Sequence, residues 1–130
     1  MASLDTDILV SLLKGDPDAI EKIGKLQTTE DQIATTTITA YELVKGAFLS
    51  SRADENLARV RETISNLRVL ELSLGATEEA ARIYKELRTK GKMVGEFDVL
   101  IAGIVKFNDE ALVTRDEHFK AIRGIKLITW

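Results

Sequence analysis

The sequence predicts one α/β domain, a three-layer α/β/α fold with a central, mainly parallel sheet of about five strands. Its 130 residues, with 45% hydrophobic and 30% charged side chains, suit one globular domain with a real core. Short apolar or β-branched runs alternate with helix-type segments almost throughout, which is typical of a parallel sheet covered on both faces. No internal repeat, low-complexity run or linker interrupts the pattern, so we expect residues 1–130 to form a single domain.

The first segments are a strand and two helices. Residues 2–4 read as a short strand, and Asp5 or Thr6 is expected to cap the helix that follows. Gly15 is a typical helix stop. The next helix begins near Pro17, where a missing N–H costs nothing. Its expected core face consists of Ala19, Ile20, Ile23 and Leu26.

A second strand and two further helices are predicted next. Residues 33–37 are rich in β-branched side chains. Thr39 is expected to cap the following helix, with Glu42 at the capping-box position three residues later. Asp54 is expected to cap another helix, and residues 69–72 form a third strand candidate. The expected apolar side of the helix after residue 39 includes Leu43, Ala47 and Phe48.

The last part of the chain continues the alternation. A long helix is predicted over residues 77–90, with Tyr84 among its core-facing residues, and an apolar helix over residues 95–107. Residues 111–114 read as a fourth strand and residues 126–129 as a fifth, with a turn or short helix between them. Right-handed crossovers would place all the strand ends on one side.

Three acidic residues stand out from this pattern. Asp5 and Asp116 follow predicted strands, and an open parallel sheet binds its ligands just outside the carboxyl ends of its strands. Asp98 shares a helix face with Ala102 and Val105. A carboxylate on an apolar face must be paired, protonated or bound to a metal, because an isolated buried charge is very costly.

Each acidic residue also has an ordinary explanation. Asp5, Asp7 and Asp116 could cap helices. Glu42 could complete a capping box or be a solvated helix charge, and Asp98 could pair with a lysine or arginine or cap its own helix. Four carboxylates on different elements nevertheless suit one or two divalent ions, which activate water and clamp the oxygens of a phosphodiester. The pattern as a whole predicts a metal-dependent nuclease.

Composition limits the metal and the location. The chain has no cysteine and a single histidine, His118, to which we assign no role. Any metal must therefore be held by oxygen, which favours Mg²⁺ or Mn²⁺. The net charge of -3 gives no general attraction to nucleic acid. No apolar run could span a bilayer and no signal-peptide layout is present, so we expect a cytoplasmic protein.

Four motifs resemble those of PIN domains, specifically the VapC-type ribonuclease toxins of toxin–antitoxin pairs. They occur in the family's order and span nearly the whole chain. They are Leu4–Leu9, Thr39–Leu43 with Gly46, Asp98–Ala102, and Val113–Asp116 with Phe119. The chain departs from the family at Asp7, where asparagine is usual.

The resemblance implies a Mg²⁺- or Mn²⁺-dependent endoribonuclease. By motif position its catalytic acidic residues would be Asp5, Glu42, Asp98 and Asp116, with Asp5 and Asp98 as metal ligands and the other two binding directly or through water. The supporting residues would be Thr6, Asp7, Thr114 and Arg115. The family also implies a homodimer and a cognate antitoxin, for which the surface near Phe48 and Leu49 is a candidate.

Three other functions remain open. A haloacid-dehalogenase-like phosphatase would use Asp5 as nucleophile and Asp7 as general acid, although Leu9 departs from that motif and the chain is short for that fold. A non-catalytic PIN-like module would bind a protein partner and never cut RNA. A receiver-like signalling domain would need a lysine after a late strand, and none is suitably placed.

Overall fold

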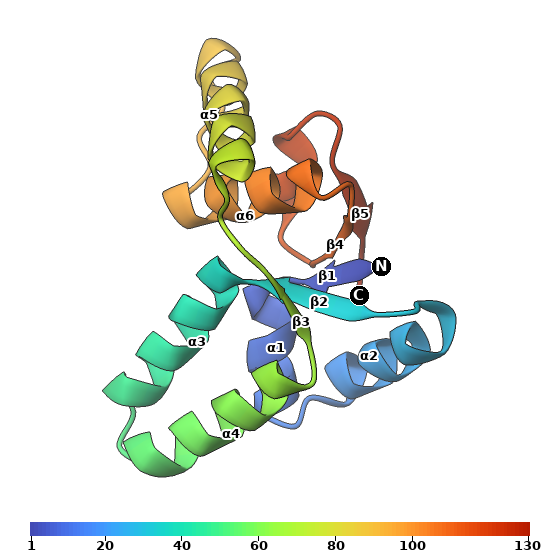
Figure 1. The fold of residues 1–130 in the computed structure, drawn as a ribbon, viewed down its shortest axis with the longest axis vertical. Coiled ribbons are helices and arrows are strands. Elements are labelled where there is room, and N and C mark those ends of the chain that lie inside the picture. Colours follow the sequence, from blue (N-terminus) through green and yellow to red (C-terminus); the bar gives the residue numbers. More distant parts are fainter.

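A five-stranded parallel sheet divides the molecule into three layers (Figure 1). The structure is a computed structural model that describes residues 1–130. The strands are β1 (Ala2–Leu4), β2 (Ile33–Thr36), β3 (Arg68–Leu70), β4 (Ala111–Val113) and β5 (Lys126–Ile128). Their order is β3-β2-β1-β4-β5, and every neighbouring pair is parallel. The predicted fold class is confirmed.

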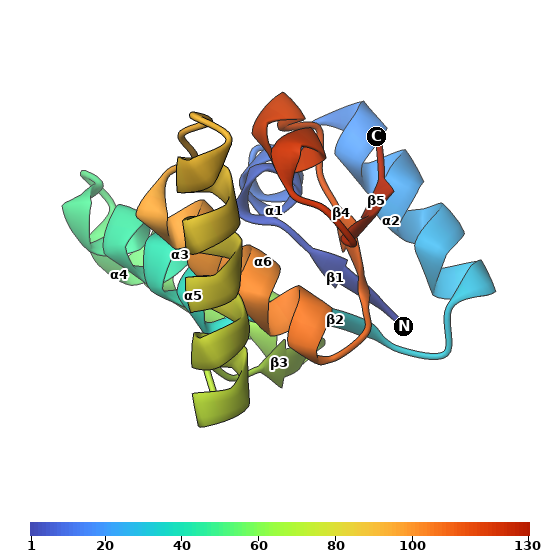
Figure 2. The same cartoon turned by 90° about the horizontal axis from the view of Figure 1, so that it is seen from above.

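Helices cover both faces of this sheet. One face carries α1 (Thr6–Leu13), α2 (Pro17–Thr29), α3 (Thr37–Leu49) and α4 (Ala53–Ser65). The other carries α5 (Leu74–Thr89), α6 (Glu96–Phe107) and the short 3₁₀ helix η1 (Glu117–Ala121), as Figure 2 shows from above. None of the helices combines the length and the apolar character that crossing a membrane requires.

The direction of winding reverses at β1. From β1 the chain adds β2 and β3 on one side and later β4 and β5 on the other. Such a switch point leaves a crevice at the carboxyl ends of the two central strands, where open α/β sheets bind their ligands. Leu4 of β1 pairs in register with Val113 of β4, so Asp5 and Thr114 leave the sheet side by side. The fold itself therefore brings residues 109 positions apart in sequence to one point.

The two cores pack against the central strands. On one face Ile8 and Leu9 of α1 are completely buried, and on the other Leu112 of β4 packs with Phe119, which is also fully buried. Full burial of a phenylalanine side chain stabilises a fold by about 2–3 kcal/mol. A buried Phe119 anchors η1, and η1 begins directly after Asp116.

The predicted start of α3 is wrong. Thr36, the last residue of β2, is the N-cap, and its hydroxyl accepts the Thr39 backbone N–H at 3.1 Å. Thr39 therefore lies inside the helix, and the expected capping box with Glu42 does not form. Thr36, the last residue of β2, precedes Thr39 by three residues, and its hydroxyl already supplies the cap oxygen of α3. The predicted cap of α4 is also wrong, since Arg52 rather than Asp54 occupies that position.

Three large side chains predicted to face the core are on the surface. Ile20, Phe48 and Tyr84 are 51%, 62% and 38% exposed. The buried residues of α2 are Ala19, Ile23 and Leu26. Ile20 follows Ala19, and neighbouring helical residues point about 100° apart. The same offset turns Phe48 away from buried Ala47 on α3. The apolar pattern of these helices is wider than the face they bury.

The crossing of α5 and α6 gives a test of the packing. A Cβ added at Gly103 would lie 2.5 Å from the Cβ of Ala80 and 2.8 Å from its backbone nitrogen. Gly103→Ala should therefore lower the free energy of unfolding by about 1–3 kcal/mol, measured by urea denaturation. Gly24 of α2 has no atom within 4 Å of such a Cβ. Gly24→Ala, the matched control, should raise stability by about 0.5–1 kcal/mol. A Gly103→Ala protein as stable as wild type would contradict this packing.

Candidate active site

Asp5 is a buried carboxylate at the switch point. It is only 4% exposed, and its Oδ2 accepts a hydrogen bond from the Thr114 hydroxyl at 2.8 Å. Asp5 holds the N-cap position of α1, yet its side chain makes no cap hydrogen bond there. Burial raises the pKa of Asp5 from 3.8 to about 7, against the lowering effect of the Thr114 hydrogen bond. The carboxylate thus points to β4 rather than to its own helix.

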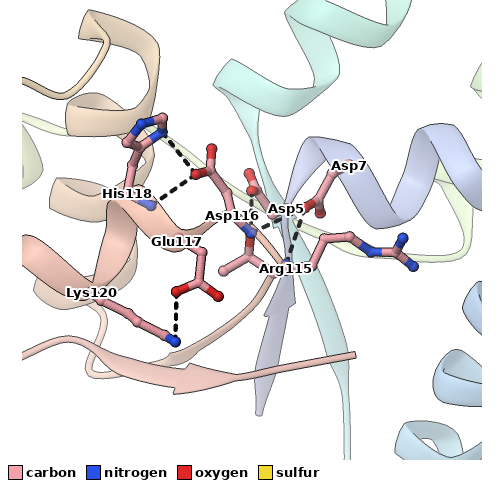
Figure 3. A network of polar contacts seen from close by, with 8 residues as sticks. Asp5, Asp7, Arg115, Asp116, Glu117, His118 and Lys120 are labelled. Atoms are coloured by element: carbon pink, nitrogen blue, oxygen red, sulfur yellow. Dashed lines mark hydrogen bonds and ion pairs between the residues drawn. The ribbon is translucent and has the colours of Figure 1, made fainter.

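Thr114 links three acidic residues, Asp5, Asp7 and Asp116, which lie close together in Figure 3. Its hydroxyl lies 2.8 Å from Asp5 and 3.3 Å from Asp7, and it accepts the Asp116 backbone N–H at 3.0 Å. A hydroxyl has one hydrogen, and the shorter distance favours donation to Asp5. Asp7 also accepts the Arg115 backbone N–H at 3.1 Å. Three of the four expected supporting residues, Asp7, Thr114 and Arg115, are therefore joined through the first residues after β4.

Asp116 and His118 form the outer side of this group. Asp116 is the N-cap of η1, and its Oδ1 accepts the His118 backbone N–H at 2.9 Å. His118 Nδ1 lies 2.9 Å from the same oxygen. Asp116 therefore does cap η1, as the ordinary explanation expected. Only its Oδ1 accepts the cap hydrogen bond, and Oδ2 takes no part in the cap. His118, given no role from the sequence, contacts a site residue (Figure 3).

Glu42 reaches the site from α3. Its Oε1 accepts a hydrogen bond from the Thr6 hydroxyl at 2.8 Å, and that hydroxyl lies 3.0 Å from the Thr39 hydroxyl. Thr6 belongs to α1, directly after Asp5. The contact that the capping box would have made within α3 is replaced by one that joins two helices.

Asp98 enters from the first turn of α6. It is partly buried and forms no ion pair with a lysine or arginine, so the pairing explanation fails. Burial raises the pKa of Asp98, and the negative charges of Asp116 and Glu42 raise it further. These mutual effects mean that the carboxylates at the start of η1, on α3 and on α6 share one electrostatic site.

The oxygen donors fit a hard divalent cation. None of Asp5, Asp7, Glu42 or Asp98 has a lysine or arginine partner to offset the shared negative charge. Oδ1 of Asp7 is buried without a hydrogen-bond partner. Such oxygens are the ligands that Mg²⁺ and Mn²⁺ prefer. No three of these side chains lie close enough to form a closed ligand set, so the fit is one of chemistry and charge rather than preformed geometry.

One contact beside the site was missed by the sequence reasoning. The guanidinium of Arg115 lies 3.3 Å from the centroid of the Trp130 ring, within range of a cation–π interaction. β5 makes this possible, because the Thr114 backbone N–H bonds to Ile128 O at 3.0 Å and brings the carboxyl terminus alongside. No local spacing could have revealed a contact between residues fifteen positions apart.

Comparison with known proteins gives consistent matches along the chain. The family model described as PIN domain matches residues 2–125. The tRNA(fMet)-specific endonuclease VapC of Salmonella typhimurium is 34% identical over 128 residues, covering 98% of this chain and 96% of that protein. Ribonuclease VapC2 of Rickettsia felis is 29% identical with the same coverage of both chains.

A solved structure also matches this chain over its whole length. The crystal structure of DNA-bound VapBC from Salmonella typhimurium contains a chain that superposes with a TM-score of 0.91 and 32% identity. The match covers all of this chain and 99% of that one. Sequence and fold therefore agree on the same group of relatives.

The raised pKa of Asp5 gives a prediction for the metal-free protein. A carboxyl with a raised pKa binds its proton more tightly when folded, so stability falls as pH rises from about 4 to about 7 and then levels off. Asp5→Asn removes this cost while keeping an acceptor for Thr114. In chelator at pH 8 the variant should be more stable than wild type by up to roughly 4 kcal/mol, and by clearly less at pH 5.

Chemical denaturation at both pH values measures the difference. Asp18→Asn, at an exposed position in the first turn of α2, is the matched control and should not change the pH dependence. A stability gain of Asp5→Asn that is equal at pH 5 and pH 8 would contradict the assigned cause.

Proposed function

The chain belongs to the PIN domain family, in its VapC group, and from this membership we propose that it is a divalent-metal-dependent endoribonuclease. The observation that carries the proposal is the convergence of Asp5, Glu42, Asp98 and Asp116 on one switch point without a balancing lysine or arginine. The names of its relatives, a tRNA(fMet)-specific endonuclease and a ribonuclease, support RNA as the substrate.

Each acidic residue has a proposed role. Asp5 and Asp98 would hold the metal, and Glu42 and Asp116 would bind it directly or through water. Bound Mg²⁺ or Mn²⁺ would supply an activated water and balance the charge of the phosphodiester. Hydroxyl groups orient these carboxylates, with Thr114 holding Asp5 and Thr6 holding Glu42. A ligand held by its own hydrogen-bond partner loses less freedom when the metal binds.

Asp7 supports the site through the backbone. It occupies the position where asparagine is usual, and its Oδ2 accepts the Arg115 N–H at 3.1 Å. An asparagine carbonyl could accept the same bond, so the substitution preserves the turn after β4. The added negative charge lies beside Asp5 and contributes to its raised pKa.

The rival functions predict different outcomes. A haloacid-dehalogenase-like phosphatase would form a covalent aspartyl-phosphate on Asp5, and the family match favours the nuclease instead. A non-catalytic module would bind a partner normally after loss of Asp98. The convergence of all four carboxylates favours the enzyme over this module.

We further propose that the protein is the toxin of a type II toxin–antitoxin pair. We propose that it is a single domain that acts in the cytoplasm as a homodimer. The relative solved as part of a VapBC complex supports a protein partner. A groove of about 310 Å³ between α1, α3 and α4 is lined by both apolar and polar side chains, and Glu42 is one of the polar ones, so a segment bound there would contact a residue of the acidic site. Its apolar residues are Val10, Leu13, Leu43, Ala47 and Val60.

Two variants separate this groove from the surface expected from the sequence. Phe48 and Leu49 are 62% and 79% exposed, so that surface is also accessible. Leu13→Glu places a charge in the groove, whereas Leu49→Glu alters only the exposed surface. We expect Leu13→Glu to weaken binding of the cognate antitoxin at least about 10-fold in calorimetry, because an apolar contact is lost and a charge is desolvated. If Leu49→Glu weakens binding and Leu13→Glu does not, the result would instead favour the surface near Phe48.

Cleavage of mixed RNAs with Mg²⁺ or Mn²⁺, against a chelator control, tests the enzymatic proposal. Asp98→Asn preserves side-chain size and removes a proposed ligand charge, so cleavage should fall at least about 100-fold with an unchanged circular dichroism spectrum. Asp54→Asn, at an exposed position on α4, is the matched control and should cut at the wild-type rate. Metal binding by calorimetry gives a readout that is independent of the RNA chosen. Wild-type cleavage by Asp98→Asn at matched metal concentration would overturn the site assignment.

A further inference from the structure

Two exposed aromatic rings and a lysine lie beside the acidic site. Tyr41 of α3 and Phe97 of α6 meet edge to face, with ring centroids 5.6 Å apart and planes at 81°. Lys45 Nζ lies 5.2 Å from the first centroid and 5.4 Å from the second. We call these three residues the aromatic platform. It bridges α3 and the first turn of α6, which lie side by side in Figure 2.

The platform and the acidic site share the same two helix turns. Tyr41 directly precedes Glu42, and Phe97 directly precedes Asp98. Neighbouring residues on a helix point about 100° apart, so each turn presents its carboxylate to the switch point and its ring to the outer edge. The platform therefore forms a rim of the acidic site.

Core packing does not account for the platform. Tyr41 is 53% exposed and Phe97 is 39% exposed, whereas buried Leu43 and Val99 on the same helices supply the packing. Lys45 is exposed and forms no ion pair with any carboxylate of the chain. Both rings therefore keep solvent-accessible surface, and the Lys45 ammonium group, which lies over them, has no carboxylate partner.

The chemistry of the platform matches a single-stranded nucleotide. Proteins that bind unpaired RNA stack bases on aromatic side chains and contact phosphates with lysine or arginine. Every base has a π-face, so such stacking does not require a fixed sequence. A duplex would not offer an unstacked base to these rings.

We propose that Tyr41, Phe97 and Lys45 bind the nucleotide next to the cleaved phosphodiester in single-stranded RNA. Tyr41 stacks on its base, Phe97 holds the Tyr41 ring in place, and Lys45 pairs with an adjacent phosphate. This inference rests on the proposed ribonuclease function. The residues act on substrate binding, not on the chemical step.

Steady-state kinetics on a single-stranded RNA that the wild-type protein cuts provides the test. Tyr41→Leu should raise KM about 10-fold through loss of stacking, and Tyr41→Phe should rescue it because the ring is retained. Tyr84→Leu is the matched control, since Tyr84 is 38% exposed on α5 and belongs to neither the site nor the platform. Lys45→Met should raise KM and weaken its dependence on salt.

Abasic RNA makes the test specific to stacking. Each nucleotide beside the cut is replaced in turn by an abasic one. At one position, removal of the base should cost wild type about 10-fold in kcat/KM and cost Tyr41→Leu almost nothing further. Independent, multiplicative losses at every position would overturn the proposal.

Three other results would also overturn it. If wild type cuts RNA but Tyr41→Leu and Tyr84→Leu have the same KM, the ribonuclease stands and the platform fails. If Tyr41→Leu changes the molar mass in light scattering while KM stays at the wild-type value, the platform is a protein interface. Absence of metal-dependent cutting by wild type would remove the ribonuclease function and this inference together.

Discussion

The burial of Asp5 is the constraint on which the candidate site depends. β1 is the central strand, and its three residues are buried between parallel neighbours on both sides. The next residue, Asp5, is still only 4% exposed, so its carboxylate lies where charge is poorly solvated. Its pKa rises to about 7 as a result. A fold tolerates such a group when other residues hold it in one place, and Thr114 does so from the adjacent strand.

Two of the site's carboxylates, Asp5 and Glu42, have hydroxyl groups rather than cations as partners. The Thr114 hydroxyl donates a hydrogen bond to Asp5, and the Thr6 hydroxyl donates one to Glu42. A lysine or arginine would bind these carboxylates more strongly, but it would also neutralise them and compete with a divalent ion for the same oxygens. A hydroxyl orients a carboxylate and leaves its charge intact. The site therefore remains strongly negative, which is the electrostatic condition that the proposed metal requires.

Sequence reasoning succeeded where a residue's position on its own strand or helix decides its surroundings. Asp5 after a buried strand and Asp98 on an apolar helix face are such cases, and the parallel sheet followed from the same logic. It failed where contacts through space decide. The Thr36 hydroxyl caps α3 in place of Thr39, and Glu42 accepts a hydrogen bond from Thr6 instead of completing a capping box. The stacking of Arg115 on Trp130 depends on β5 returning beside β4. Periodicity carries no information about such pairs, and it also assigned to the core an exposed ring, Phe48.

The two cations beside the site, Lys45 and Arg115, each lie over an aromatic ring instead of pairing with a carboxylate. The chain has a net charge of -3, so a polyanion such as RNA would need local positive charge. Lys45 lies over Tyr41 and Phe97, and Arg115 lies over Trp130, without an ion pair to any carboxylate. An aromatic face attracts a cation and restrains its position but does not cancel its charge. Pairing these cations with the nearby acidic residues would have removed both the ligands for a metal and the contacts for a phosphate. Support by aromatic rings keeps the two sets of charges separate, each available to its own proposed ligand.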